Sequence, residues 1–306
     1  MKTISLLAVL FLALAPSFAQ AESSDQDKPA IKTVEGGSLL GGEDSSVQAK
    51  ARPLGLNLVD KVKSAASDAP SATFQKDTLP SVLKLLDQKL GERKTITDTS
   101  SMALDPSQLR LATDSEVRVY FIGEGAGYHN TLGFNVNASG LKAGDPKLIF
   151  PDASSYTSWL DTGANSGKSP DASAPLRPGD FVNLGSMSAG STLDFFLISD
   201  GASSGKNIFS TTSSANPDHL NHVVAFALQD SPYLIISFED MLGGGDRDYN
   251  DVLFAVDIGK VNVARLVSTP EPALFLVLGS FLGSVLLLDW RQRRTVRLPA
   301  PVRARS

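Results

Sequence analysis

An acidic, glycine-rich segment between two apolar runs places the strongest constraint on the fold of this chain. The runs at 233–237 and 252–256 have the composition of buried strands. The segment that joins them, residues 238–251, contains three consecutive glycines, Gly243 to Gly245. Glycine has no Cβ and adopts positive φ readily, so the backbone can turn tightly here. The pattern predicts an antiparallel hairpin with a charged connecting loop.

Within thirteen positions, that loop carries six side chains whose oxygen atoms can bind a metal. They are Glu239, Asp240, Asp246, Asp248, Asn250 and Asp251. Five carboxylates this close repel one another unless a cation lies among them, and Ca²⁺ takes roughly six to eight oxygen ligands of these kinds. We therefore predict a Ca²⁺ site formed by these six residues. The alternative is a solvated turn, because Asp, Asn and Gly are also common turn formers.

Short runs of strand character, separated by turn residues, extend from residue 104 to the hairpin and through it. The predicted strands are 117–121, 132–136, 147–150, 180–184, 192–199, 223–228, 233–238 and 252–258. No helical pattern interrupts them, which favours an all-β domain, an antiparallel β-sandwich or jelly-roll, over residues 104–259. The chain has no cysteine, so an apolar core, and plausibly a metal, must stabilise this domain without disulfides.

The residues before this domain have a different composition. Residues 1–21 combine Lys2, an apolar run and small residues at 19–21, which predicts a secretory signal peptide. The N-terminal region, residues 22–103, is rich in Ser, Ala, Asp, Lys and Gly up to about residue 72, and we expect most of it to be mobile, with one short ordered element at 54–62. Within that region Pro80, Gly91 and an apolar stripe between them predict one short helix near 79–91.

The C-terminal end has three parts. Residues 260–272 are expected to form a linker that ends in Pro270, Glu271 and Pro272. Residues 273–290 are apolar enough to predict a short transmembrane helix, although the uncharged run falls slightly below the roughly 20 residues that span a bilayer. The tail at 291–306 contains six arginines, so we expect it to remain cytoplasmic.

This arrangement resembles the C-terminal sorting signal of PEP-CTERM proteins, which are exported bacterial proteins. The resemblance implies processing by an exosortase-type enzyme near Pro270, Glu271 and Pro272. It also implies a precursor tethered to the inner membrane and a mature protein in the cell envelope or the extracellular exopolysaccharide matrix.

Three segments resemble the bacterial domain of unknown function 4114, in the same order along the chain: 123–134, 216–223 and 238–251. The likeness covers roughly residues 105–258. It implies a secreted or surface protein with no established enzyme activity and a suspected calcium site in the acidic loop. The resemblance also marks Glu124, Asn130 and His222 as polar residues of unassigned role.

Several other functions are disfavoured by the sequence. With both ends set aside the chain is acidic, so nucleic acid is not an expected partner. The pattern Gly201-x-Ser203-x-Gly205 has the spacing of a nucleophile elbow, but no helical sequence follows it. His219 and His222 lack a third soft ligand for zinc, and hydrogen bonding near the loop is the expected role of His222.

The favoured interpretation is a non-catalytic surface or matrix protein, adhesive or structural, with a calcium-binding β-sandwich. One alternative is a calcium-dependent carbohydrate-binding module for exopolysaccharide or cell-surface glycans, with Tyr128, Tyr156 and Trp159 as candidate stacking residues. A second alternative is a polysaccharide hydrolase that pairs Glu239 with Asp240 or Asp248.

Overall fold

The computed structural model describes residues 46–90, 105, 107, 109–156, 169–228 and 230–268. The predicted signal peptide, the segment from 269 to 306 with Pro270, Glu271 and Pro272, and Trp159 lie outside the described residues. Within the described part of the chain, no helix has the length and apolarity needed to cross a membrane.

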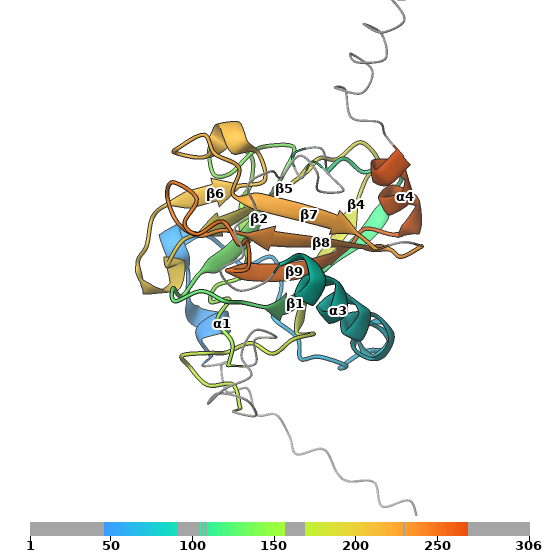
Figure 1. Cartoon of the computed structure of the whole chain (residues 1–306), viewed down its shortest axis with the longest axis horizontal. Helices are drawn as coiled ribbons and strands as arrows, with labels where there is room; N and C mark the ends of the chain where they lie inside the picture. Colours follow the sequence, from blue (N-terminus) through green and yellow to red (C-terminus); the bar gives the residue numbers. More distant parts are fainter. Residues whose placement is uncertain are drawn as a thin grey trace, which may run out of the picture. The chain divides into compact units, whose positions relative to one another are not determined.

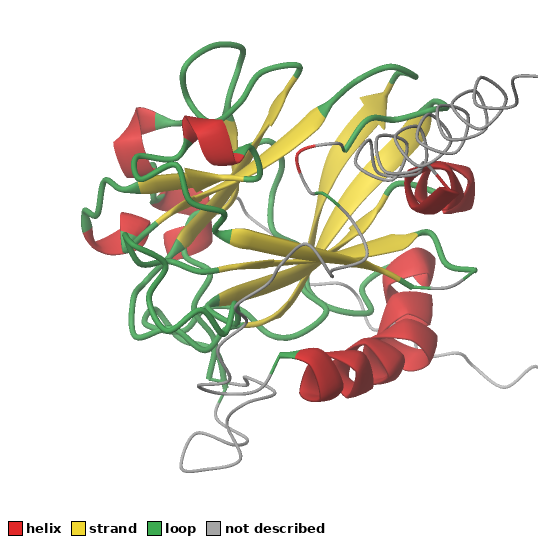
Figure 2. Ribbon diagram, turned by 45° about the horizontal axis from the view of Figure 1, so that its top comes forward, coloured by secondary structure: helices red, strands yellow, loops and turns green. Residues whose placement is uncertain are grey.

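Two antiparallel sheets pack as a sandwich, which confirms the predicted β architecture (Figure 1, Figure 2). The five-stranded sheet has the order β4-β1-β9-β8-β7 and the four-stranded sheet the order β3-β2-β5-β6. The first sheet contains β1 (Ser115–Gly123), β4 (Phe181–Met187), β7 (Val223–Ala227), β8 (Tyr233–Phe238) and β9 (Val252–Asp257). The second contains β2 (Thr131–Val136), β3 (Lys147–Phe150), β5 (Leu193–Ile198) and β6 (Ile208–Ser210).

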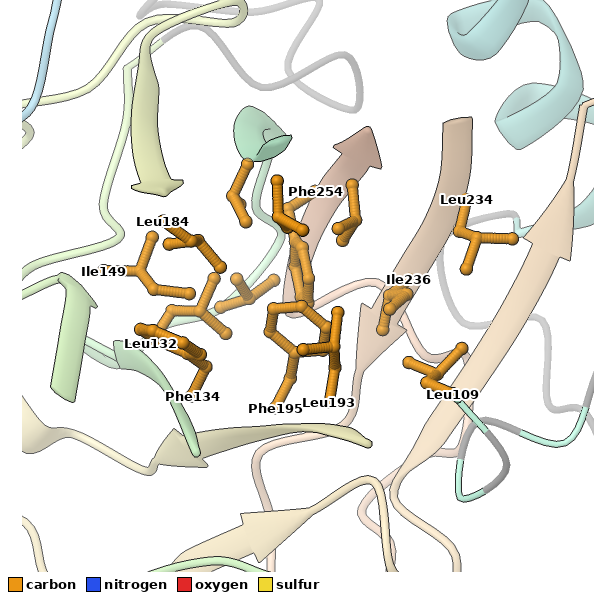
Figure 3. Close-up of a cluster of buried hydrophobic side chains, with 14 of the residues drawn as sticks. Leu109, Leu132, Phe134, Ile149, Leu184, Leu193, Phe195, Leu234, Ile236 and Phe254 are labelled. Atoms are coloured by element: carbon orange, nitrogen blue, oxygen red, sulfur yellow. The ribbon is translucent and has the colours of Figure 1, made fainter. Parts of the chain in front are cut away.

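The main core lies between the inner faces of the two sheets. Phe195 of β5 and Phe254 of β9 come from opposite sheets and their ring centroids are 5.2 Å apart (Figure 3). Leu132 and Ile236 belong to the same buried cluster. Each fully buried side chain of this size stabilises the fold by about 1.5–3 kcal/mol relative to an exposed one, so the sandwich does not need disulfides.

A helical segment covers the outer face of the five-stranded sheet. It begins with α2 (Ala69–Thr73), continues through a π-helical turn (Phe74–Thr78) and ends with α3 (Leu79–Lys89) (Figure 1). Asp68 and Ser71 cap its start reciprocally. Its buried side chains, among them Phe74 and Leu86, pack on outward-facing residues of the sheet such as Tyr120. The helix predicted near 79–91 is therefore present and begins ten residues earlier than expected.

Residues 46–63, which include the ordered element expected at 54–62, are structured over a longer stretch than their composition suggested. They contain α1 (Val47–Lys50) and a 3₁₀ turn (Pro53–Gly55). Leu58 bridges Leu148 of β3, and Lys63 bridges Phe181 of β4. Backbone pairing and a few apolar contacts hold this segment against the sandwich. The amino-acid composition of the segment does not predict such contacts.

Two further elements differ from the predictions. The strand β6 was not predicted, because it has only three residues between polar turns. The expected linker is helical as far as residue 268, where it forms α4 (Lys260–Ser268). Val263 is buried in the main core, and Asn262 Oδ1 accepts hydrogen bonds from the backbone N–H groups of Ala112 and Thr113. These contacts fix the helix against the end of the sandwich.

Candidate metal site

The acidic loop leaves the end of β8 and returns at the start of β9. The two strands pair through Phe238 and Val252, so all thirteen loop residues, 239–251, project beyond the sheet. Gly243, Gly244 and Gly245 have φ values of +84°, +84° and +43°. The predicted hairpin and the tight glycine turn are both present. The structure thereby gathers the acidic residues on either side of the glycines.

Gly245 is required by a close approach as well as by its φ value. A Cβ placed there would lie 1.9 Å from Glu239 Oε1. No side chain at position 245 can avoid that overlap unless the Glu239 carboxylate moves. The glycine therefore makes room for the carboxylate at the centre of the loop.

The five carboxylates form two groups that share one member. Glu239 groups with Asp246 and Asp248, and it also groups with Asp240 and Asp251. Within each group, one carboxylate oxygen from every residue lies within 4.8 Å of the others. Asn250 donates from Nδ2 to Asp248 Oδ2 at 2.8 Å, so it orients a member of the first group. The side chains predicted from the sequence are thus brought together around Glu239.

Glu239 is a buried carboxylate that accepts one backbone hydrogen bond, from Tyr249, and forms no ion pair with a Lys or Arg among the described residues. It is 2% exposed, and its Oε2 atom has no hydrogen-bond partner in the described part of the chain. Burial, together with the charges of Asp246 and Asp240, raises the pKa of Glu239 to about 7. A buried charged group without a partner costs several kcal/mol, unless it becomes neutral or gains a counter-ion.

The second group has the same electrostatic character. Burial raises the pKa of Asp251 to about 9, with the charges of Asp240 and Glu239 adding to the effect. The pKa of Asp240 is also raised, first by burial. Among the described residues, no Lys or Arg forms an ion pair with Glu239, Asp240 or Asp251. An all-oxygen donor set, strongly negative and partly buried, fits a hard divalent cation such as Ca²⁺.

His222 supports the loop through hydrogen bonds, which is the role expected from the sequence. It is fully buried, with Nε2 2.9 Å from Asp218 Oδ2 and Nδ1 3.1 Å from the Glu239 carbonyl oxygen. Its ring stacks on Phe209 with centroids 3.8 Å apart. His222 belongs to neither carboxylate group.

Asp218 is a supporting residue that was not among the predicted site residues. Its Oδ2 accepts a hydrogen bond from Gly243 N at 2.8 Å, which fixes the glycine turn. Although burial acts in the opposite direction, the Gly243 N–H and His222 hold the pKa of Asp218 down at about 2. The spacing of Asp218 and His222, four positions apart, was the only sequence signal for this pair.

Asn130 and Glu124 have different relations to the loop. Asn130 is 1% exposed and donates from Nδ2 to Asp240 Oδ2 at 2.7 Å, so it contacts the second group directly. Glu124 belongs to neither group and accepts a hydrogen bond from Ser155 N at 3.1 Å. Burial raises its pKa to about 7. The structure thus places Asn130 at the site and Glu124 outside the two carboxylate groups.

The serine motif does not form a nucleophile elbow. Gly201–Ser203 is a 3₁₀ turn, and the chain continues into β6 rather than into a helix. Of the candidate stacking residues, Tyr128 is 44% exposed, and the Tyr156 hydroxyl donates a hydrogen bond to Asp171.

A family model described as a domain of unknown function (DUF4114) matches residues 187–259, so a DUF4114 domain is present there. The match spans β5 to β9 and includes the acidic loop and the segment 216–223, whereas the third resembling segment, 123–134, lies outside it. No curated protein matches the chain, and no solved structure matches it.

Proposed function

We propose that this protein is an exported, non-catalytic module whose acidic loop binds Ca²⁺ and which acts in the cell envelope or extracellular matrix in an adhesive or structural role. The observation that carries the proposal is Glu239, a 2% exposed carboxylate that groups with four other acidic side chains and whose Oε2 has no hydrogen-bond partner among the described residues. A solvated turn, the alternative interpretation, does not bury its charges.

In this proposal the ligands come from the six predicted residues, with Glu239 central and Asn250 orienting Asp248. The ion supplies the positive charge that the surrounding side chains lack. His222 and Asp218 position the loop without binding the ion. Because the ion binds only the folded state, it stabilises the fold by about 2.7 kcal/mol at a hundredfold excess over Kd.

Thermal unfolding with Ca²⁺ and with a chelator tests the binding. We expect a clear rise in Tm with Ca²⁺ and no rise in an Asp246→Ala/Asp248→Ala double variant. Equal melting of the parent protein in both conditions would contradict calcium binding. Mg²⁺ at the same concentration is the matched ion control, since Mg²⁺ requires a smaller octahedral site.

Export is supported by the sequence signals at the two ends, 1–21 and 270–306. Mass spectrometry of the protein recovered from its native host tests it. We expect a mature N-terminus after Ala21 and a C-terminus near Pro270, with the protein in the envelope or matrix fraction. Recovery of the uncleaved 306-residue chain from the cytoplasm would refute the export and sorting proposal.

A second candidate, calcium-dependent carbohydrate binding, is favoured by one observation. Tyr128 is 44% exposed and lies two residues before Asn130, which bonds Asp240 of the acidic loop. An exposed ring beside a cation is a common platform for a sugar. Polysaccharide pull-down that fails with chelator and with Tyr128→Ala would support this candidate, whereas binding that survives both would exclude it.

A further inference from the structure

The two carboxylate groups of the loop each have the dimensions of a separate cation site. The oxygens lie within 4.8 Å of one another in the group of Glu239, Asp246 and Asp248 and in the group of Glu239, Asp240 and Asp251. Ca²⁺ binds oxygens at about 2.3–2.6 Å, so two ligands of one ion lie up to about 5 Å apart. Each group satisfies that limit by itself.

Glu239 is placed to serve both groups. It is the only member that they share, and it comes from the end of β8, whereas Asp246 and Asp248 follow the glycine turn. Its Oε1 lies against Gly245, and its buried Oε2 has no hydrogen-bond partner in the described part of the chain. A carboxylate between two cations uses one oxygen for each. Such bridging would satisfy the buried Oε2 without any further donor from the protein.

Hydrogen bonds connect the second group to the four-stranded sheet. Asp240 Oδ2 accepts a hydrogen bond from Asn130 Nδ2 at 2.7 Å, and Asn130 Oδ1 accepts one from Asp200 N at 3.0 Å. Asn130 precedes β2 and Asp200 follows β5, and both strands belong to the four-stranded sheet. A cation at Asp240 and Asp251 therefore lies where the loop of one sheet meets the loops of the other.

We infer that the acidic loop binds two divalent cations, the first at Glu239, Asp246 and Asp248 and the second at Glu239, Asp240 and Asp251, with Glu239 bridging them. This inference rests on the proposed calcium binding and adds the number of ions and the ligands of each. The second ion links the hairpin loop to the four-stranded sheet through Asn130, whereas the first ion orders the glycine turn alone.

Counting bound Ca²⁺ by equilibrium dialysis of the full chain tests the inference. The parent is expected to bind two ions per chain. Asp246→Asn removes a ligand of the first group only and Asp251→Asn a ligand of the second only, so each variant should bind one ion. Glu239→Gln removes the shared ligand and should bind none. Asp87→Asn, at an exposed position of α3, is the matched control and should bind two.

Each outcome separates this inference from the proposed function. One ion bound to the parent, or two ions still bound by Asp251→Asn, overturns the second site and leaves calcium binding intact. No ion bound to the parent overturns both. Melting in chelator shows that each variant is folded, because exchange of a carboxylate for an amide removes repulsion and should not lower Tm. Should Asp251→Asn fail to fold, Asp240→Asn removes a ligand of the same group, and the count for the parent decides by itself.

Discussion

Two carboxylates of this protein are equally buried and differ in what surrounds them. Asp194 of β5 and Glu239 at the end of β8 are each 2% exposed. The Asp194 side chain accepts four hydrogen bonds, from Gly140 N and from the hydroxyl groups of Ser210, Thr211 and Thr212. Glu239 accepts one backbone hydrogen bond, from Tyr249, but its Oε2 atom has no hydrogen-bond partner among the described residues, and the charges of Asp246, Asp240 and Asp248 act on it.

The difference distinguishes a structural carboxylate from a candidate metal ligand. Buried charges persist when hydrogen bonds or opposite charges compensate them. At Asp194 the chain provides that compensation through hydrogen bonds, and these bonds also hold a loop and strand β6 against the sheet. At Glu239 the neighbouring Asp246, Asp240 and Asp248 add negative charge, so the group either becomes neutral or needs a counter-ion, which a bound cation would supply. Burial alone would not distinguish the two residues.

The largest expected effect is at Asp194. Asp194→Ala leaves one buried N–H and three hydroxyl groups without their acceptor, and we expect unfolding free energy to fall by about 3–5 kcal/mol. Denaturant unfolding should show the same loss with Ca²⁺ and with chelator. Asp145→Ala, at a side chain that is 84% exposed, is the control and should change stability by less than about 0.5 kcal/mol. A loss that appeared only with Ca²⁺ would mean that Asp194 also belongs to the metal site.

The sequence predicted most of the sandwich because its strands are marked by local signals. The hairpin 233–238 and 252–257 follows from apolar runs on both sides of glycines, and the structure has it. Strand β6 pairs with the preceding strand β5 and was missed because it has only three residues, whereas residues 46–63 pair with strands far away in the chain, which no local pattern predicts. Helix α4 was missed because its anchor, Asn262, bonds residues about 150 positions earlier.

The candidate site was predictable to the extent that it is contiguous. All six proposed ligands lie within one loop, so composition and glycines were enough to find them. Their division into two groups, with Glu239 in both, depends on the three-dimensional path of the loop and cannot be predicted from the spacing of the acidic residues in the sequence. The same holds for Asp218 and Asp200, whose contacts to the site arise only when separate loops meet.

Glu239→Gln should behave in the opposite way to Asp194→Ala. With Ca²⁺ in hundredfold excess we expect it to lose the stabilisation of about 2.7 kcal/mol that the ion gives the parent. With chelator it should melt no lower than the parent, because an amide removes a buried charge that has no compensation. Differential scanning calorimetry in the two conditions measures both effects. A loss of stability in chelator as large as that of Asp194→Ala would make Glu239 a structural residue.

Gly245→Ala tests whether a glycine is needed at position 245 to accommodate the Glu239 carboxylate. Alanine at positive φ is strained, and its Cβ would overlap Glu239 Oε1, so we expect a loss of roughly 2 kcal/mol and at least a tenfold weaker Ca²⁺ affinity. Gly243→Ala is the matched control, since φ there is +84° and nothing lies within 4 Å of the added Cβ. It should share the backbone strain and keep the affinity. Titration calorimetry measures the Ca²⁺ affinity of both variants. Equal affinities would contradict a specific role of Gly245 in making room for Glu239.

Glu124 shares features with both Asp194 and Glu239, and we expect its replacement to have the smallest effect on stability. Its carboxylate is partly buried and accepts backbone hydrogen bonds from Ser155 and Ala126, as Asp194 does from Gly140. Burial raises its pKa from the ordinary 4.5 to about 7, so the protonated form stabilises the fold; this contribution is complete below pH 4.5 and is lost as the pH rises through 7.

Glu124→Gln cannot ionise and keeps an acceptor for Ser155 N, so we expect it to be more stable than the parent by about 1 kcal/mol at pH 8 and equal to it at pH 4. Denaturant unfolding at the two pH values, in chelator, measures this difference, and Asp87→Asn on the exposed side of α3 is the control. A variant less stable than the parent at pH 8 would show that the ionised carboxylate is compensated, as at Asp194. If instead Ca²⁺ abolished the gain at pH 8, Glu124 would lie within reach of the cations and would join Glu239 as a ligand.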